Sequence, residues 1–261
     1  MVNQAKGQAG RPSIRLFVPE TFSAGQVLSL PVGQAHYLAM VMRRKEGDAI
    51  ALFNGQDGEW RAEITQVGKK NVEVQLTQPL LPQRPGPDVW LAFSPIKGKV
   101  EFVVEKAVEL GVSRLLPVFT RRAVVTSVNE EKLRLTAIEA AEQCGRCDVP
   151  PITPCKDLAA LLALWPAGRV LLHADENGAG RPLKDLVSGL SGALGVLVGP
   201  EGGFAPEEQQ MLAAHTAVKG FGMGPRILRA DTASVAALAC VIAWHGDWHE
   251  QPHFTFNKGT A

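Results

Sequence analysis

Two glycine-bracketed stretches near the end of the chain decide the fold: Leu197-Val198-Gly199-Pro200-Glu201-Gly202-Gly203 and Gly222-Met223-Gly224-Pro225-Arg226-Ile227-Leu228-Arg229-Ala230-Asp231-Thr232. Each stretch follows a short apolar run (residues 195–198 and 217–221) that predicts a buried strand, and each precedes a predicted helix. The five glycines and two prolines set backbone angles that other residues adopt only at a cost, which suits loops whose N–H and C=O groups contact a ligand. The repeated order of strand, tight loop and helix predicts an α/β domain with a ligand site at these loops.

The second stretch also carries chemistry, because Arg226, Arg229 and Asp231 place two cations and a carboxylate within six residues. For either stretch alone, an ordinary strand-to-helix turn is an alternative, but the two in succession favour a site. Neither has the spacing G-x-G-x-x-G or G-x-x-x-x-G-K-[ST], so the fingerprints of a Rossmann dinucleotide site and of a P-loop are both missing.

Composition is that of a globular protein with one large or two modest domains, since the chain has 261 residues and a net charge of +1. That charge gives no overall electrostatic case for nucleic-acid binding, but residues 1–86 hold ten Lys and Arg against seven Asp and Glu, so any basic surface is local. The sequence shows no signal-peptide pattern and no apolar stretch of spanning length, which predicts a cytoplasmic protein without a membrane partner.

Cys144 and Cys147 have the C-x-x-C spacing of some metal and redox sites. Zinc would need a second ligand pair at suitable spacing, and none is evident in the sequence. A thioredoxin-like motif would follow a strand, whereas this one ends a predicted helix. The pattern favours cysteines that have no metal-binding or redox function, and we expect no metal.

The first part of the chain is predicted to be a small β-barrel. Residues 1–12 are polar and glycine-rich and predict a disordered tail, whereas residues 13–84 show short alternating runs with hairpin signals at Asn54-Gly55 and Asp57-Gly58. One helix is expected over residues 36–43, followed by the basic cluster Arg43, Arg44 and Lys45. Such a cluster is either a solvated helix end or a phosphate contact.

The pattern then changes to that of an α/β domain over residues 85–250, with a tail at 251–261. Four prolines in residues 79–87 predict a stiff connector. Beyond it, apolar runs alternate with helical segments such as residues 99–110 and 129–145, which predicts a largely parallel sheet. Ligands of such sheets bind beyond the carboxyl ends of the strands, where both glycine-bracketed stretches lie.

The last predicted helix covers residues 232–248, with Thr232 as its N-cap. It is apolar on nearly all sides, with one stripe through Val235 and Leu238 and another through Ala236 and Trp244. Either a second subunit covers its outer face or one subunit buries it entirely.

Five segments together resemble the SPOUT superfamily of S-adenosylmethionine (SAM)-dependent RNA methyltransferases, and in particular the family that methylates N3 of a uridine in bacterial 16S rRNA. They are the two glycine-bracketed stretches, Lys97-Gly98-Lys99 with residues 104–112, Arg121-Arg122, and residues 141–146. The resemblance covers residues 13–248. Two departures are visible, since Asp231 stands where the family more often has glutamate, and Arg121-Arg122 where a Glu-Arg pair is common.

The resemblance implies an N-terminal PUA-like β-barrel that grips RNA and a C-terminal SPOUT α/β domain whose loops are threaded into a trefoil knot. It implies SAM as methyl donor, no metal, and a homodimer formed through the knot region. Its substrate would be 16S rRNA, at uridine 1498, in a 30S subunit or late precursor.

The resemblance also implies roles for residues at the positions that match the family's motifs. The implied donor contacts are Leu197, Val198, Gly199, Pro200, Glu201, Gly202, Gly222, Gly224, Ile227, Leu228, Arg229 and Thr232. The implied RNA contacts are Arg43, Arg44, Lys45, Lys97, Arg121, Arg122 and Arg146.

Arg226, Arg229 and Asp231 are the candidate catalytic residues. Uridine N3 carries a proton, so the enzyme must favour the imide anion. Asp231 is expected to accept this proton, and Arg226 or Arg229 to stabilise charge on the carbonyl oxygens. The arginines alternatively hold RNA phosphates. Two other functions stay open here, a non-catalytic RNA-binding or ribosome-assembly protein and a SPOUT ribose 2′-O-methyltransferase.

Overall fold

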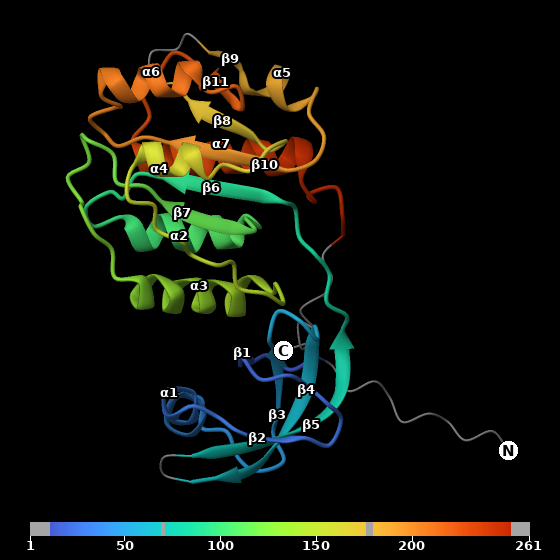
Figure 1. The fold of residues 1–261 in the computed structure, drawn as a ribbon. Helices are drawn as coiled ribbons and strands as arrows, with labels where there is room; N and C mark the ends of the chain where they lie inside the picture. Colours follow the sequence, from blue (N-terminus) through green and yellow to red (C-terminus); the bar gives the residue numbers. More distant parts are fainter. Residues whose placement is uncertain (1–10, 69–70, 176–179, 252–261) are drawn as a thin grey trace, which may run out of the picture. The chain divides into compact units, whose positions relative to one another are not determined.

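The computed structural model describes residues 11–68, 71–175 and 180–251. This part of the chain forms two compact units, one before Pro85 and one from Pro85 to Gln251 (Figure 1). Among the described residues, no helix combines the length and the apolar character needed to cross a bilayer.

The first unit is built on a five-stranded sheet in the order β1-β3-β4-β5-β2, in which only β1 and β3 pair in parallel. Three register shifts between β4 and β5 disturb the ladder, and such bulges bend a sheet. The sheet is curled like half a barrel and encloses its own apolar core, which confirms the predicted PUA-like barrel. Its strands are β1 (Arg15–Phe17), β2 (Val27–Ser29), β3 (Ala49–Phe53), β4 (Glu59–Val67) and β5 (Val72–Leu81).

The connector begins later than predicted, because Pro79 belongs to β5. Pro79 lies opposite Trp60 at one of the register shifts, where a residue without an N–H is tolerated. The hairpin signals are confirmed, since the Asn54 side-chain oxygen accepts the N–H groups of Gln56 (2.9 Å) and Asp57 (2.8 Å) between β3 and β4.

The helix expected over residues 36–43 begins earlier and changes character. It consists of α1 (Val32–His36) and the π-helix η1 (Tyr37–Val41), anchored by the fully buried Leu38. Arg43 is not helical but left-handed, with φ 51°, which lets Arg44 N–H donate to the Leu38 carbonyl (2.9 Å) and ends the helix.

The second unit has a six-stranded sheet in the order β7-β6-β10-β8-β11-β9, and every neighbouring pair is parallel, as predicted. Both glycine-bracketed stretches follow strands of this sheet, β10 and β11. The strands are β6 (Val89–Phe93), β7 (Arg114–Pro117), β8 (Val170–Ala174), β9 (Arg181–Pro182), β10 (Leu194–Val198) and β11 (Val218–Gly222).

Helices cover both faces of this sheet (Figure 1). The helices are α2 (Val100–Glu109), α3 (Glu130–Cys144), α4 (Leu158–Ala163), α5 (Leu183–Val187), α6 (Pro206–Ala214) and α7 (Ala230–His245). Side chains of α4 and α6 share a core cluster with Leu171 and Leu197 of the sheet, whereas α7 packs against β10, α2 and α5. The sheet is therefore a central layer covered by helices on both faces.

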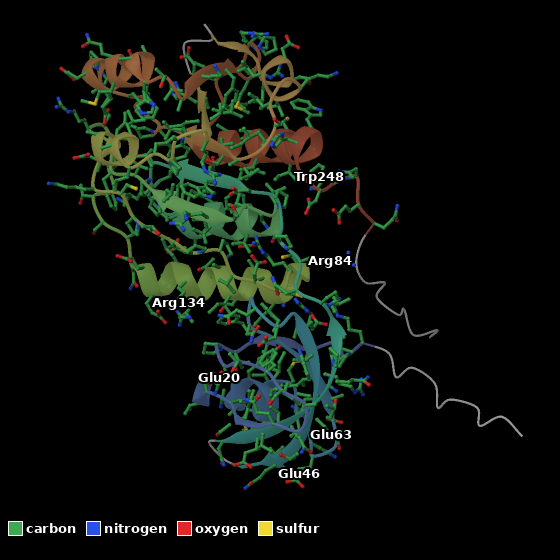
Figure 2. All side chains as sticks on the ribbon, turned by 45° about the vertical axis from the view of Figure 1, so that its right-hand side comes forward. Glu20, Glu46, Glu63, Arg84, Arg134 and Trp248 are labelled. Atoms are coloured by element: carbon green, nitrogen blue, oxygen red, sulfur yellow. The ribbon has the colours of Figure 1, made fainter. Side chains whose placement is uncertain are left out.

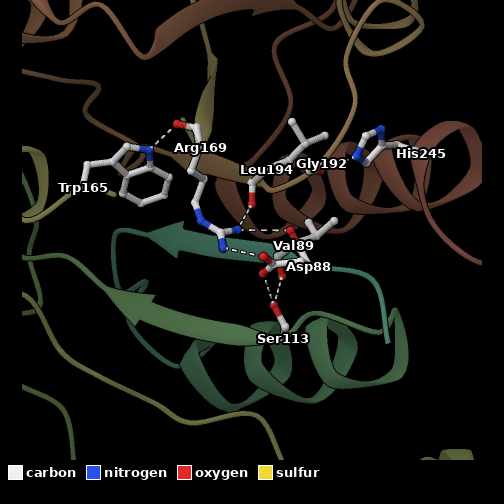
Figure 3. Close-up of polar contacts among 8 residues, drawn as sticks. All are labelled: Asp88, Val89, Ser113, Trp165, Arg169, Gly192, Leu194 and His245. Atoms are coloured by element: carbon white, nitrogen blue, oxygen red, sulfur yellow. Dashed lines mark hydrogen bonds and ion pairs between the residues drawn. The ribbon is translucent and has the colours of Figure 1, made fainter. Parts of the chain in front are cut away.

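The starts of the strands are held together by the buried Arg169 (Figure 3). Its guanidinium donates to the backbone carbonyls of Leu194 (2.8 Å) and Asp88 (3.1 Å) and pairs with the Asp88 carboxylate (2.7 Å). It lies 3.9 Å from the ring centroid of Trp90, and Trp165 Nε1 donates to the Arg169 carbonyl (2.8 Å). Structural polar groups thus occupy the amino ends of the strands, opposite the glycine-bracketed loops.

Helix α7 differs from the prediction at its start and on its outer face. Arg229, not Thr232, is the N-cap, because the Arg229 carbonyl already accepts the first helical hydrogen bond, from Ala233 N–H (2.8 Å). Among the described residues, the buried side chains of α7 lie on one face, which includes Ala237 and Val241. Trp244 is 44 % exposed, and Trp248, labelled in Figure 2, is 56 % exposed.

Candidate active site

The loop after β10 is shaped by close contact between Gly199 and Phe204. A Cβ on Gly199 would lie only 2.6 Å from Cε2 of the Phe204 ring, so the loop can take this path only with glycine. Phe204 is 3 % exposed and packs edge-on against His173, with 5.2 Å between ring centroids. Burial lowers the pKa of His173, and the nearby Asp175 opposes this shift only in part.

Glu208, in the first turn of α6, joins two loops. Its buried carboxylate accepts the backbone N–H groups of Ala205 (2.8 Å) and Arg121 (3.0 Å), and so fixes the loop after β7 to the loop after β10. Our sequence analysis missed this residue. A glutamate three residues into a predicted helix is the signal that identifies it.

A first hollow opens at the carboxyl ends of β8, β10 and β11. It measures about 750 Å³, including the solvent at its mouth. It is lined by Ala174, Asp175, Val198, Gly199, Pro200, Glu201, Gly203, Phe204, Met223, Gly224, Arg226, Ile227, Leu228, Ala230 and Ala233. Most of these residues are small or apolar, so backbone groups and apolar surface dominate the wall.

A second hollow, of about 620 Å³, adjoins the first and shares Pro200 and Glu201 with it. Its lining is strongly charged, with Lys97, Lys99, Arg122, Arg229, Asp231 and Glu201 beside Pro95, Ile96, Val124, Pro200 and Gly202. Four cations thus face two carboxylates, a lining suited to an anionic or polar substrate. Lys99 belongs to one of the segments that carry the family resemblance, but the sequence analysis gave it no role in this site.

Asp231 is the most enclosed carboxylate of the second hollow, with 15 % of its side chain exposed. One oxygen, Oδ1, accepts the backbone N–H of Thr232 at 2.8 Å. The other, Oδ2, lies 3.8 Å from Nζ of Lys99. The carboxylate is therefore held through one oxygen and presents the other to a cation.

The predicted residues divide between these hollows. Arg226 lines the first hollow, whereas Arg229, Asp231, Lys97 and Arg122 line the second. Among the predicted donor contacts, the first hollow includes Val198, Gly199, Pro200, Glu201, Gly224, Ile227 and Leu228.

The other predicted donor contacts lie elsewhere. Gly202 and Arg229 line the second hollow, Leu197 is buried in the core beside α4, Gly222 ends β11, and Thr232 lies in the first turn of α7.

The remaining predicted RNA contacts lie outside both hollows. Arg121 is exposed and 3.4 Å from Glu207, and Arg43, Arg44 and Lys45 follow η1 in the first unit. Arg146 has 13 % of its side chain exposed, pairs with Asp148 (2.9 Å) and donates to the Val108 carbonyl (3.0 Å). These contacts hold the Arg146 side chain within the second unit.

The C-x-x-C cysteines show no metal geometry. The described residues contain no cluster of three or more His, Cys, Asp or Glu that could bind a metal.

Comparison with known proteins gives a consistent result. The family model for an RNA methyltransferase domain matches residues 83–242, and that for an RNA methyltransferase PUA domain matches residues 30–77. The ribosomal RNA small subunit methyltransferase E of Rickettsia conorii is 36 % identical over 209 residues, covering 79 % of this chain and 85 % of that protein. The protein of the same name from Bacillus subtilis is 30 % identical over 222 residues, covering 80 % and 86 %.

A solved structure agrees with these matches. The crystal structure of a ribosomal RNA small subunit methyltransferase E from Neisseria gonorrhoeae bound to S-adenosyl methionine superposes with a TM-score of 0.81 at 30 % identity. The superposition covers 90 % of this chain and 99 % of that one.

Proposed function

The chain belongs to the RNA methyltransferase family, and from this premise we propose that it transfers a methyl group from SAM to N3 of a uridine in 16S rRNA, at uridine 1498. The proposed substrate is an assembled 30S subunit or its late precursor, which would place the enzyme in the cytoplasm. The observation that carries the proposal is the pair of adjoining hollows, one formed by glycine-bracketed loops and one lined by cations around a carboxylate.

The first hollow fits SAM. Its wall consists of the loops after β10 and β11, and the closeness of Gly199 to Phe204 leaves the backbone itself facing the ligand. Asp175 lies at the edge of the same hollow, where a carboxylate suits the hydroxyl or amino groups of the donor. We assign the donor contacts of the first hollow to residues 198–201, Gly224, Ile227 and Leu228. When bound, SAM supplies an electrophilic methyl group and a neutral thioether as leaving group.

The second hollow fits the target base. Because Pro200 and Glu201 belong to both hollows, a base in the second hollow lies next to a donor in the first. We assign Asp231 the role of accepting the N3 proton, and Arg229 that of stabilising charge on a carbonyl oxygen. Arg226 lines the donor side and is better placed to orient the donor. Holding the two reactants in this order supplies much of the catalysis, because it replaces a chance encounter by a fixed geometry.

The basic residues around the second hollow are proposed to hold the RNA. Lys97 and Arg122 line the hollow itself, and Arg121 lies next to Arg122 in sequence. The cluster of Arg43, Arg44 and Lys45 would contact phosphates from the first unit. The target base must also leave its stack so that N3 becomes accessible.

We also propose a homodimer formed through α7, in the region that is predicted to be knotted. The helix leaves Trp244 exposed and Ala236 and Cys240 half-buried, so that an apolar strip remains for a partner copy. The threading of the chain into a knot stays a prediction.

Two measurements test the proposal. Calorimetric titration with SAM should show saturable binding by the wild-type protein. Incubation with labelled SAM and 30S subunits, compared with naked 16S rRNA, should then label one uridine. N3 methylation blocks the Watson–Crick edge and stops reverse transcription at that position, whereas ribose methylation leaves the edge free. Label on a ribose would show the 2′-O reaction instead, and absence of SAM binding with or without RNA would favour a non-catalytic RNA-binding protein.

A further inference from the structure

Lys99 holds a fixed position at the edge of the second hollow. It follows the loop after β6 and is the N-cap of α2. Its backbone N–H donates to the Ile96 carbonyl (3.0 Å), and its carbonyl accepts the N–H of Val103 (3.0 Å). Both backbone groups are therefore occupied, and only the side chain is left to act in the hollow.

The ammonium group of Lys99 lies near the Asp231 carboxylate but does not form a close hydrogen bond with it. The separation of 3.8 Å between Nζ and Asp231 Oδ2 is longer than the ~2.7–2.9 Å of a charge-assisted hydrogen bond. About half of the Lys99 side chain, 51 %, is exposed. Its Nζ also lies 5.5 Å from the ring centroid of Phe102, which restricts where the flexible side chain points. The hollow thus presents a hydrogen-bond donor and an acceptor next to each other.

This pair complements the edge of uracil that reacts. The imide edge of uracil carries a carbonyl oxygen, an N3–H and a second carbonyl oxygen, so an acceptor stands on each side of a donor. If the N3–H of the uracil donates to the Asp231 carboxylate, one of the two neighbouring carbonyl oxygens lies next to the Lys99 ammonium group. We infer that Lys99 is a further catalytic residue, which donates to a carbonyl oxygen of the target uracil while Asp231 accepts the N3 proton. The inference rests on the proposed function and adds a residue to it.

The reaction balances with these two groups. The Asp231 carboxylate takes the N3 proton, and the negative charge spreads over N3 and the two carbonyl oxygens, where Lys99 stabilises it. The electron pair on N3 forms the new bond to the methyl carbon, while the carbon–sulfur bond breaks and its pair stays on sulfur. The products are N3-methyluridine, a neutral thioether and a proton, which Asp231 releases to water.

The same pair would reject cytidine. Cytosine N3 carries a lone pair instead of a proton, so in the reactive position it would face the Asp231 carboxylate with no hydrogen between them. A largely enclosed carboxylate oxygen that finds no donor on the base is an effective basis for rejecting an analogue. Lys99 and Asp231 would therefore choose the base as well as activate it.

The test compares Lys99→Met with Lys99→Arg and Lys106→Met, using full-length protein and reconstituted small subunits. Methionine has a similar length and no charge. Lys106 lies on the same helix, pairs with Glu105 and Glu109 and lines neither hollow, so Lys106→Met controls for the lost charge. At saturating RNA and SAM, the single-turnover rate of Lys99→Met should fall by about 10²-fold. SAM affinity and RNA affinity should stay near those of wild type, and Lys99→Arg should recover most of the rate.

A second substrate distinguishes a catalytic role of Lys99 from a purely structural one. In subunits assembled with 5-fluorouridine RNA, fluorine withdraws electron density, so N3 loses its proton more easily and the carbonyl oxygens carry less charge. The penalty of Lys99→Met relative to wild type should be clearly smaller on this RNA. A Lys99→Met rate like that of Lys106→Met would overturn the inference, as would an equal penalty on both RNAs. If wild type itself methylates no uridine, the proposed function fails, which is a different outcome.

Discussion

Replacing Gly199 with alanine perturbs the first hollow at its tightest point. The new Cβ would lie 2.6 Å from one atom of the Phe204 ring and 3.1 Å from two others. Ordinary contact between carbon atoms needs about 3.5–4.0 Å, so the ring must retreat by about 1 Å. Since Phe204 is 3 % exposed and already packs against His173, the ring can retreat only by disturbing packed neighbours or by moving into the first hollow, whose wall it forms.

The substitution should affect both the stability of the fold and the affinity for SAM, and the size of each effect can be estimated. Overpacking a filled core costs about 1–3 kcal/mol, and Gly199→Ala should lower the free energy of unfolding by that amount. The displaced ring belongs to the wall of the first hollow, so SAM should lose contacts as well. A loss of about 1.4–3 kcal/mol corresponds to a rise in Kd of about 10-fold to 100-fold.

Calorimetric titration with SAM and thermal unfolding measure these effects on the same samples. Gly189→Ala is the matched control, because a Cβ at Gly189 meets no atom within 4 Å and both quantities should stay unchanged. Adding Phe204→Leu to Gly199→Ala should restore part of the stability, since the clashing ring is gone. Wild-type SAM affinity and melting temperature in Gly199→Ala would refute the assignment of this loop to the donor.

Three further predictions concern other parts of the second unit. Arg169→Met should lower the free energy of unfolding by about 3–5 kcal/mol in chemical denaturation, because two backbone carbonyls and one carboxylate lose their partner, and a loss well below 1 kcal/mol would contradict this. Burial lowers the pKa of His173 below its ordinary 6.5, so the unfolded chain binds a proton that the folded one resists. The free energy of unfolding should therefore fall as the pH drops through 6.5 and below, and His173→Leu should flatten this dependence; equal pH profiles would exclude the effect. Lys97→Met should reduce the slope of log K for RNA against log salt by about 0.7–0.9, and an unchanged slope would mean that Lys97 contacts no phosphate.

Local sequence signals predicted the strands and loops around which the candidate site is built. Both apolar runs became strands, but only the first is the buried strand that was predicted. Every residue of β10 is buried, as a central parallel strand with apolar residues on both faces requires, whereas β11 is buried only at Phe221 and its Lys219 is exposed. Ligand loops follow the carboxyl ends of such strands, so the place of the hollows was predictable as well. The two parts of the chain were also predicted from its residue patterns; the resemblance added that the first is PUA-like and the second an RNA methyltransferase domain, as the two family matches confirm.

Interactions between distant segments were not predictable in this way. The sequence around Arg146 does not show that its guanidinium donates to the Val108 carbonyl (3.0 Å), which folding brings from another part of the chain. Thr232 has the right chemistry for an N-cap, yet the backbone enters the helix at Arg229. In both cases the outcome depends on where the chain is held by other elements, which residue type and spacing do not encode.

Lys99 and Asp231 are also brought together by packing between elements that are distant in sequence. Helices α2 and α7 pack against each other, and the N-cap residues of both, Lys99 and Arg229, line the second hollow. The start of a helix carries a partial positive charge, so two such starts favour a negative charge developing on a bound base. Lys99 and Arg229 add full charges to the same place, and Asp231, in the first turn of α7, is the carboxylate that we propose accepts a proton there. A chain with a net charge of only +1 thereby concentrates cations where the proposed imide anion forms, without needing a basic surface overall.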